Sequence, residues 1–515
     1  MGRKETFSAQ ISSGYACSGD NIILGGAMLD GQPVSDAQVK IPLKTMNRHG
    51  LIAGATGTGK TKTLQVISEQ LSEKGVPVLL MDVKGDLSGI AMPGEKKPFI
   101  VERHAKLNLP YEPKGFPVEL LSLSKQEGVR LRATVSEFGP VLLARILDLN
   151  DTQEGVLALI FKYCDDNKLA LLDMKDIKKV LQYVTEEGKA EIEKNYGKIS
   201  TATTGIILRK LIELEQQGAD LFFGELSFDV RDLLRKDRNG NGYINIIRLT
   251  DIQDKPKLFS TFMLSLLAEI YGLMPEKGDA DKPELAIFID EAHLIFDQAS
   301  KALLDQIETI VKLIRSKGVG IYFVTQNPTD VPDGVLAQLG LKVQHALRAF
   351  TAVDRKSIKL TAENYPVSEF YKTDEVITSL GIGEALVTAL NEKGVPTPLA
   401  ATMLRAPVSR MDILSPDEIS SLNRASSLVQ KYSQVVDRDS AYEILNRKVA
   451  NVPNNDTGSG QQDQWGQQPS SQGGARQAQR PAYRPAANSI EKDVVKVLTS
   501  ATFIRGVFGI LKKVM

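Results

Sequence analysis

The octapeptide Gly-Ala-Thr-Gly-Thr-Gly-Lys-Thr at residues 54–61 constrains this chain more than any other feature of its sequence. It fits the pattern G-x-x-x-x-G-K-[ST], in which glycines let the backbone curl so that successive N–H groups face phosphate oxygens. An apolar run at residues 49–54 precedes the loop, and Leu64, Ile67 and Leu71 follow it at helical spacing. This strand–loop–helix context favours a phosphate-binding loop over the alternative, an ordinary glycine-rich turn.

The same motif predicts the ligands of the loop. Lys60 should reach the β- and γ-phosphates of ATP, and the Thr61 hydroxyl should bind Mg²⁺, which prefers hard oxygen ligands. The predicted cofactors are therefore ATP and Mg²⁺. The predicted nucleotide-binding residues are Gly54, Ala55, Thr56, Gly57, Thr58, Gly59, Lys60, Thr61 and Lys62.

A second polar site follows the apolar run at residues 285–289, which ends in Asp290 and Glu291. Asp290 is predicted to hold Mg²⁺, directly or through water, and Glu291 to act as the general base that activates the attacking water. Burying two adjacent acids is costly unless a cation compensates them, so a metal site at this strand end accounts for the pair. Alone, the pair is explained equally well as the cap of the next helix. Beside a phosphate loop, the catalytic interpretation is favoured.

Polar residues also flank the next predicted strand, residues 319–324. Gln326 follows it, where P-loop ATPases with a catalytic glutamate place the residue that senses the γ-phosphate; the alternative is a turn formed by Thr-Gln-Asn-Pro. Arg315 precedes the strand. It is predicted either to neutralise charge at a neighbouring subunit's nucleotide or only to interact with a helix C-terminus. Arg348 is a second candidate for this trans-acting arginine.

Composition bounds the class of protein and its compartment. Of 515 residues, 42% are hydrophobic and 24% are charged, as in soluble globular proteins. Lys plus Arg and Asp plus Glu number 63 each, which argues against a uniformly basic nucleic-acid-coating surface but not against a basic channel. The two cysteines, Cys17 and Cys164, have no metal-like spacing and indicate a reducing compartment. Because the sequence contains neither a transmembrane segment nor a signal peptide, a cytoplasmic location is predicted.

Short apolar runs alternate with helical patterns along much of the chain, which predicts an α/β fold with a mainly parallel sheet covered on both faces. Between residues 104 and 236, apolar residues instead recur every three or four positions. The predicted segments are a small β-rich N-terminal segment (1–48), the first part of an ATPase core (49–103), an all-helical insertion (104–236), the second part of the core (237–410), a helical extension (411–450), a disordered linker (451–488) and an amphipathic C-terminal helix (489–515).

The last two segments differ sharply in composition. The linker is rich in Gln, Gly, Ser, Pro and Asn and cannot bury enough apolar surface to fold. The C-terminal helix has one apolar face with lysines away from its centre. This face is predicted to pack against a protein partner or a sister subunit, and contact with a membrane surface is the alternative.

Several segments together resemble the HerA/FtsK group of ATPases, and more closely the bacterial HerA-like proteins. The resemblance covers roughly residues 5–410. The segments that carry it are the phosphate loop, Asp-Val-Lys-Gly-Asp (82–86), Phe-Ile-Asp-Glu-Ala-His (288–293), Arg-Ser-Lys-Gly-Val-Gly (315–320), Thr-Gln-Asn-Pro (325–328), Gln-Leu-Gly (338–340) and Val-Gln-His-Ala-Leu-Arg-Ala-Phe-Thr (343–351).

The resemblance implies a RecA-like P-loop NTPase core and a ring, expected to be a homo-hexamer with its active sites between subunits. It supports Gln326 as the sensor and Arg315 as the trans-acting arginine, and it implies that Asp82 and Lys84 border the nucleotide. HerA proper also has a substantial N-terminal β-barrel and works with a nuclease in DNA end processing. Here only 48 residues precede the predicted core.

Two functions from different classes are expected. The first is Mg²⁺-dependent ATP hydrolysis that drives a DNA translocase or helicase-like motor. The second is a nucleotide-dependent switch or assembly ATPase that acts on a protein partner. Stimulation of ATP hydrolysis by DNA distinguishes them, because DNA raises the hydrolysis rate of a motor that moves along it and does not raise that of a switch that acts on a protein.

Overall fold

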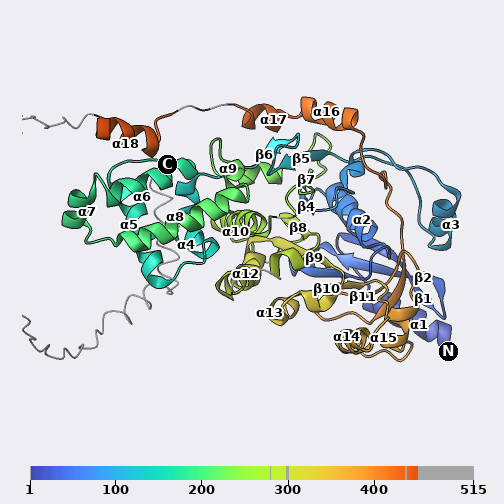
Figure 1. Ribbon diagram of the computed structural model, residues 1–515. Helices are drawn as coiled ribbons and strands as arrows, with labels where there is room; N and C mark the ends of the chain where they lie inside the picture. Colours follow the sequence, from blue (N-terminus) through green and yellow to red (C-terminus); the bar gives the residue numbers. More distant parts are fainter. Residues whose placement is uncertain are drawn as a thin grey trace, which may run out of the picture. The chain divides into compact units, whose positions relative to one another are not determined.

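The computed structural model describes residues 2–450 except 254, 279, 297–300, 435 and 437 (Figure 1). The predicted linker (451–488) and C-terminal helix (489–515) lie outside the described residues, so both stay predictions. Among the helices of the described part, none combines the length and the apolar character that a membrane span requires.

One sheet of twelve strands organises the described residues, in the order β2-β1-β12-β11-β10-β3-β9-β8-β4-β7-β5-β6. Neighbours from β10 to β6 pair in parallel, and β11, β12, β1 and β2 extend the sheet by antiparallel pairing. The predicted α/β fold with a mainly parallel sheet is confirmed. The strands are β1 (Asn21–Leu29), β2 (Gln32–Pro42), β3 (Gly50–Ala53), β4 (Val78–Asp82), β5 (Val118–Ser122), β6 (Val129–Arg130), β7 (Ile244–Arg248), β8 (Leu285–Ile289), β9 (Val319–Thr325), β10 (Leu341–Gln344), β11 (Glu384–Thr388) and β12 (Ala400–Leu404).

The central strands are buried along their whole length because helices cover both faces of the sheet. Alternate residues of a strand face opposite sides, so each strand contributes to two cores. Leu80 and Phe288 pack in one core with Leu64 of the helix that follows the phosphate loop. Leu79 and Ile287 belong to the other core, with residues from the helices between β7 and β9.

Helices make up most of the remaining structure. Outside the segment between β6 and β7, they are α1 (Arg3–Gly14), α2 (Lys60–Glu73), α3 (Pro98–Lys106), α10 (Pro256–Leu273), α11 (His293–Phe296), α12 (Lys301–Ile314), α13 (Asp333–Leu336), α14 (Ala352–Glu363), α15 (Thr373–Ser379), α16 (Pro416–Ala425), α17 (Ser427–Tyr432) and α18 (Ala441–Ala450). Short 3-10 turns are η1 (Leu43–Thr45), η2 (Ser88–Ala91), η3 (Val230–Leu234), η4 (Arg315–Lys317) and η5 (Pro328–Asp330).

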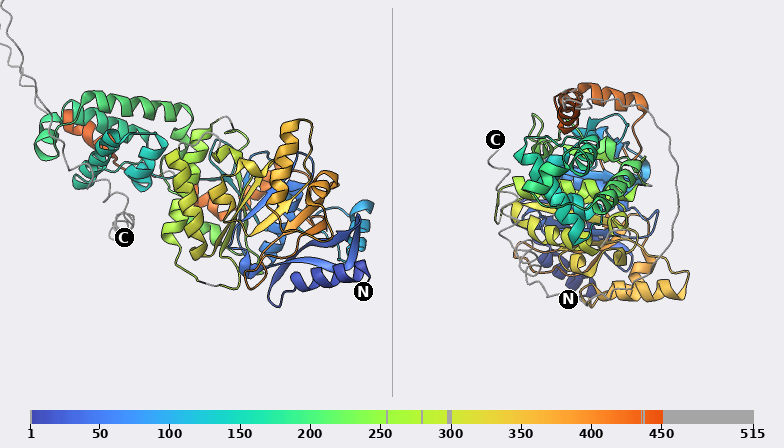
Figure 2. Two further views of the ribbon diagram at one scale, coloured as in Figure 1. Left: turned by 90° about the horizontal axis from the view of Figure 1, so that it is seen from below. Right: turned by 60° about the vertical axis from the view of Figure 1, so that its left-hand side comes forward.

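The helical insertion starts later than the periodicity predicts. Residues 104–134 hold β5 and β6, which continue the parallel sheet beyond β7. The β5 segment Val-Glu-Leu-Leu-Ser is buried at every position, and so short an apolar run cannot be assigned to strand or helix by periodicity alone. Figure 2 shows α5, α6 and α8 gathered as neighbours (teal to green). The helices of the insertion are α4 (Val135–Ile146), α5 (Asp151–Asp166), α6 (Met174–Thr185), α7 (Lys189–Asn195), α8 (Thr201–Gln216) and α9 (Ala219–Phe222).

The N-terminal segment is only partly the β-rich unit that was predicted. β1 and β2 form an antiparallel pair that joins the main sheet through β12. The helix α1 precedes them and contacts β2. This helix is mostly polar and buries only Phe7 and Ile11, so its sequence carries too weak an apolar stripe to predict it.

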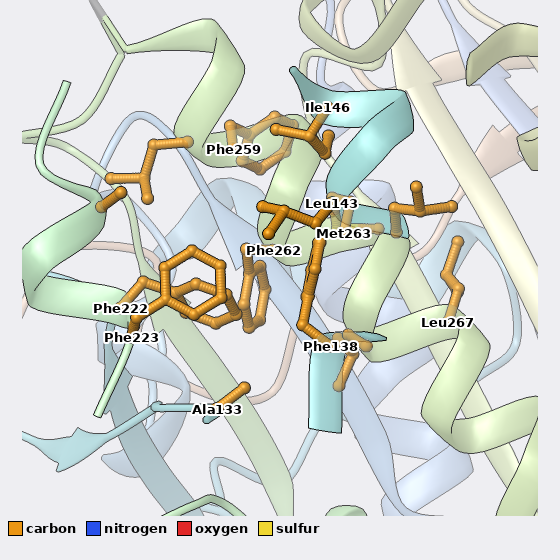
Figure 3. Packing of buried hydrophobic residues seen from close by; sticks show 14 of the residues in the cluster. Ala133, Phe138, Leu143, Ile146, Phe222, Phe223, Phe259, Phe262, Met263 and Leu267 are labelled. Carbon is orange, nitrogen blue, oxygen red and sulfur yellow. The ribbon is translucent and has the colours of Figure 1, made fainter. Parts of the chain in front are cut away.

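An aromatic cluster joins the insertion to the sheet-covering helix α10 (Figure 3). Phe138 of α4 lies edge-on to Phe223, with ring centroids 5.4 Å apart, and near Phe222 at 6.4 Å. Phe262 of α10 contacts Phe222 at 6.0 Å. The insertion and the core therefore share one continuous hydrophobic interior.

Replacing Phe138 with Ala should lower the free energy of unfolding by about 3–5 kcal/mol, because the side chain is 3% exposed and its removal leaves a cavity. The matched control is Phe99→Ala, since Phe99 is 63% exposed; its effect should stay within about 0.5 kcal/mol. Chemical denaturation followed by circular dichroism measures both. Equal effects of the two substitutions would contradict the packing described for α4.

Candidate active site

The carboxyl ends of four adjacent parallel strands meet at one edge of the sheet. The order β3-β9-β8-β4 puts β9 between the strand that leads into the phosphate loop and the strand that ends in the acidic pair. β9 (Val319–Thr325) also confirms the strand that was predicted at residues 319–324. The strand order brings together the loop after β3, Gln326 after β9, Asp290 and Glu291 after β8, and Lys84 after β4.

The phosphate loop has the curled backbone that its glycines predict. Gly54, Gly57 and Gly59 have φ of +154°, +78° and +111°. A Cβ atom at Gly54 would lie 2.4 Å from Cβ of His345, so the close packing of the loop on the segment after β10 requires glycine there. The Ala55 N–H also donates to the Ala346 carbonyl at 2.8 Å.

Lys60 begins α2 and is 5% exposed. Its Nζ donates to the carbonyls of Gly54 at 2.6 Å and Ala55 at 3.1 Å, so the ammonium group lies within the curl of the loop. Burial lowers the pKa of Lys60, as does the charge of Lys84, while Glu291 and Asp290 raise it. The loop lysine is thus electrostatically coupled to the acidic pair.

The next two residues of α2 differ in their surroundings. Thr61 is partly buried in the first turn, beside Lys60. The Lys62 Nζ donates to the Met411 carbonyl at 2.6 Å and to Gln65 at 3.4 Å, which directs this side chain to the segment after β12. Lys62 can therefore contact a phosphate bound at the loop only through its main-chain N–H, which lies in the first turn of the helix.

Asp290 and Glu291 are almost fully buried, at 4% and 6% exposure. Asp290 Oδ2 and Glu291 Oε2 are buried without a hydrogen-bond partner among the described residues. Burial raises the pKa of Asp290 to about 7; Lys84 lowers it and Glu291 raises it further. Buried carboxylate oxygens without partners are costly, so the pair fits a site that is completed by a cation and a water molecule.

The donor set matches Mg²⁺ held together with a substrate. Within the described ranges, no three His, Cys, Asp or Glu side chains cluster as a self-contained metal site. Mg²⁺ typically keeps several waters and is held through one or two protein oxygens plus phosphates. The Asp290 carboxylate, the Thr61 hydroxyl and a bound triphosphate would supply that set.

Glu291 has an unusual environment for a helix cap, the alternative role. Its φ is +48°, a left-handed conformation that non-glycine residues rarely adopt and that is often found at functional sites. Oε1 forms an ion pair with Lys84, and Oε2 lies 3.3 Å from His293 Nδ1. The carboxylate is therefore held by Lys84 from the neighbouring strand end and by His293, two residues further along its own segment.

Gln326 contacts the phosphate loop. Its Oε1 accepts a hydrogen bond from the Thr56 hydroxyl at 3.5 Å, and the side chain is otherwise exposed. The Thr-Gln-Asn-Pro segment also forms a turn, because Asn327 caps η5 and accepts from the Thr329 N–H at 3.4 Å. The contact with the phosphate loop involves Gln326 and the turn involves Asn327, so the turn does not exclude the predicted sensor role of Gln326.

The two candidate arginines lie at opposite edges of the sheet. Arg315 precedes β9, and its side chain is exposed at the amino end of the strands. β9 has seven residues, so about 20 Å separates this edge from the phosphate loop. Arg348 follows β10 at the loop edge and donates to the carbonyls of Thr378 at 2.9 Å and Leu380 at 3.5 Å.

Two residues beside the loop have no role that could be predicted from the sequence. His345 is fully buried, its Nε2 lies 2.8 Å from the Thr63 hydroxyl, and burial together with the Lys60 charge lowers its pKa to about 4. Arg103 donates to the Gly383 carbonyl at 3.0 Å, and the Gly383 N–H donates to the Thr58 carbonyl. Neither contact has a local sequence signal, because each joins segments more than 200 residues apart.

Comparisons with known proteins identify relatives of this chain. Curated relatives include the DNA double-strand break repair helicases HerA of Sulfolobus acidocaldarius and Saccharolobus solfataricus. They are 24% and 25% identical over 356 and 358 residues, and each match covers 68% of this chain and 64% of the relative. The chain therefore spans less than two thirds of the length of these relatives.

Solved structures show the same fold. The bacterial conjugative coupling protein TrwB, in an unbound form, matches with a TM-score of 0.52 and 14% identity over 79% of this chain and 95% of that chain. TrwB in complex with the ATP analogue ADPNP matches with a TM-score of 0.50 and 15% identity, over 78% and 99% of the two chains.

The match to a family model is the most extensive of these findings. The model described as "Helicase HerA-like C-terminal" aligns with residues 28–514, nearly the whole chain. Together with the P-loop ATPase fold and the four-strand arrangement of polar residues, this match shows that the chain belongs to the Helicase HerA-like C-terminal family, within the HerA/FtsK type of P-loop ATPases.

Proposed function

We propose that this chain is a Mg²⁺-dependent ATPase that assembles as a ring and drives movement along DNA. One observation carries the ATPase part of the proposal. A buried lysine in a curled phosphate loop lies at one sheet edge with two buried carboxylates, each of which has one oxygen without a hydrogen-bond partner in the described part of the chain, and the lysine and the carboxylates are electrostatically coupled. This is the arrangement that phosphoryl transfer to water requires.

Each residue has a proposed role. Lys60 and the loop N–H groups bind the β- and γ-phosphates, and Thr61 and Asp290 hold Mg²⁺. Glu291 accepts a proton from the attacking water, and Gln326, in contact with Thr56, senses the γ-phosphate. When Mg²⁺ is bound it offsets the charge that develops on the phosphate oxygens.

The DNA and ring parts of the proposal have separate support. The curated relatives are DNA repair helicases, which supports DNA as the polymer. The exposed position of Arg315, about 20 Å from its own phosphate loop, suits an arginine that completes a neighbour's site and favours a ring of identical subunits.

The equal numbers of acidic and basic residues support a second candidate, a nucleotide-dependent switch that acts on a protein partner. An ATPase assay with and without duplex and single-stranded DNA separates the two candidates. A motor's hydrolysis rate rises with DNA, and this rise disappears steeply as salt increases. A hydrolysis rate that is unchanged by duplex and by single-stranded DNA would contradict the motor function and favour the switch function.

Replacing Glu291 with Gln should leave binding of Mg²⁺–ATP within about twofold and lower kcat by at least about a hundredfold, because the amide cannot accept the proton of water. Binding of a fluorescent ATP analogue and phosphate release measure the two effects. The matched control is Glu308→Gln, which changes an acidic side chain of α12 that pairs with Lys312. Turnover that survives in Glu291→Gln would remove Glu291 from the mechanism.

Arg315→Ala should lower kcat on the order of a thousandfold if the guanidinium acts across the subunit boundary. Arg315→Ala and Glu291→Gln subunits, co-expressed with different tags, should then regain activity together. In a random 1:1 ring, about a quarter of the interfaces pair an intact Glu291 with an intact Arg315 from the neighbour.

Arg348→Ala is the control in the same mixing experiment. If Arg315 is the trans-acting residue, Arg348→Ala alone keeps most of the activity. Loss of activity in Arg348→Ala, restored by mixing with Glu291→Gln, would assign the role to Arg348 instead.

A further inference from the structure

The turn after β4 is built around a buried carboxylate. Asp82 ends the strand, is 1% exposed, and accepts hydrogen bonds from the N–H groups of Gly85 at 2.7 Å, Asp86 at 3.1 Å and Leu87 at 3.2 Å. Gly85 has a φ of +79°, and a Cβ atom there would lie 2.8 Å from Cγ2 of Thr250. Both the capping and the close packing fix the course of the turn, and with it the position of Lys84.

This turn presents Lys84 to the end of the neighbouring strand. β4 and β8 pair in parallel with Met81 opposite Ile289, so the residues that follow each strand lie side by side. Lys84 Nζ forms an ion pair with Oε1 of Glu291. Burial lowers the pKa of Lys84, but the Glu291 and Asp290 carboxylates outweigh it, and the net pKa lies above its usual range. The lysine is therefore charged at neutral pH.

The ion pair leaves the two oxygens of Glu291 in different states. Oε1 is neutralised by Lys84, whereas Oε2 is buried, has no hydrogen-bond partner among the described residues and lies 3.3 Å from His293 Nδ1. The backbone of Glu291 is in an uncommon left-handed conformation, so the side chain depends on contacts beyond its own strand for its orientation. Lys84 provides one of these contacts, through the ion pair between its ammonium group and the Glu291 carboxylate.

We propose that Lys84 is a positioning residue for hydrolysis: it holds Glu291 by Oε1 so that Oε2 is the oxygen that receives the proton of water. In the step, the water oxygen bonds to the γ-phosphorus, the bond from that phosphorus to the β–γ bridging oxygen breaks, and ADP leaves with the electron pair. The water proton passes to Glu291, and Lys84 stays protonated.

This assignment differs from a second phosphate-binding role for Lys84. The charge of Lys84 lowers the pKa of Lys60, so both ammonium groups lie in the same electrostatic environment. A phosphate ligand contributes to affinity, whereas a residue that acts through Glu291 contributes to turnover and not to binding. Affinity and kcat therefore separate the two roles.

The inference rests on the proposed ATPase function and is tested with Lys84→Met and Lys84→Arg in the full chain. Lys84→Met should lower kcat by at least about tenfold, with the Kd for a non-hydrolysable ATP analogue and Mg²⁺ within about twofold of wild type. Lys84→Arg keeps the charge and should retain a kcat several-fold above that of Lys84→Met. Lys106→Met, which breaks an exposed ion pair with Glu102, is the matched control and should keep the wild-type kcat.

A double substitution tests whether the two residues act together. In single-turnover measurements, adding Lys84→Met to Glu291→Gln should cause no further loss, because Lys84 works only through the carboxylate. Lys84 is 37% exposed in a surface turn, so thermal unfolding should show all variants folded, and Lys84→Gln serves as a further charge-removing variant.

Three results would overturn the inference: an unchanged or raised kcat in Lys84→Met, a loss of affinity that parallels the loss of kcat, or an additional loss in the double variant. Failure of the proposed function looks different. In that case the wild-type chain does not hydrolyse ATP, or Glu291→Gln keeps its turnover. A normal Lys84→Met beside an inactive Glu291→Gln would reject only the role of Lys84.

Discussion

The parallel pairing of β3, β9, β8 and β4 is the constraint on which the rest of the structure depends. Parallel strands end at one edge of a sheet, so residues from four distant parts of the chain become neighbours there. If any two of these strands paired antiparallel, the polar residues that follow one of them would lie at the opposite edge of the sheet. The polar site is thus a consequence of sheet topology, which in turn depends on buried apolar strands and helices on both faces.

Burial then sets the chemistry of the site. Lys60, Asp290 and Glu291 are each less than 7% exposed, so their charges interact through a medium less polar than water. Lys84 supplies a second positive charge at the same edge. The strained Glu291 backbone and the two carboxylate oxygens that lack hydrogen-bond partners among the described residues carry a cost in stability, and such costs are often found at functional sites.

Local sequence signals predicted much of this arrangement. The loop motif, the acidic strand end and the polar residue after β9 each have a short pattern with a physical reason, and the pairing order confirms their shared edge. What the sequence could not predict depends on contacts between distant segments. α1 has too few apolar residues, β5 is too short for its periodicity to decide, and the packing of His345 on Gly54 joins two remote loops. The ion pair between Lys84 and Glu291 is of the same kind, because it follows from strand pairing and not from a motif.

The central claim is that the phosphate loop and the acidic pair act on one nucleotide–metal unit. The most direct measurement is a crystal structure of the chain with a non-hydrolysable ATP analogue and Mg²⁺. We predict phosphate oxygens among the N–H groups of residues 54–61, and Mg²⁺ about 2.1 Å from the Thr61 hydroxyl with Asp290 in its coordination shell. A water between the γ-phosphate and Glu291 should complete the site. A nucleotide bound away from this loop, or a metal without contact to either Thr61 or Asp290, would contradict the account.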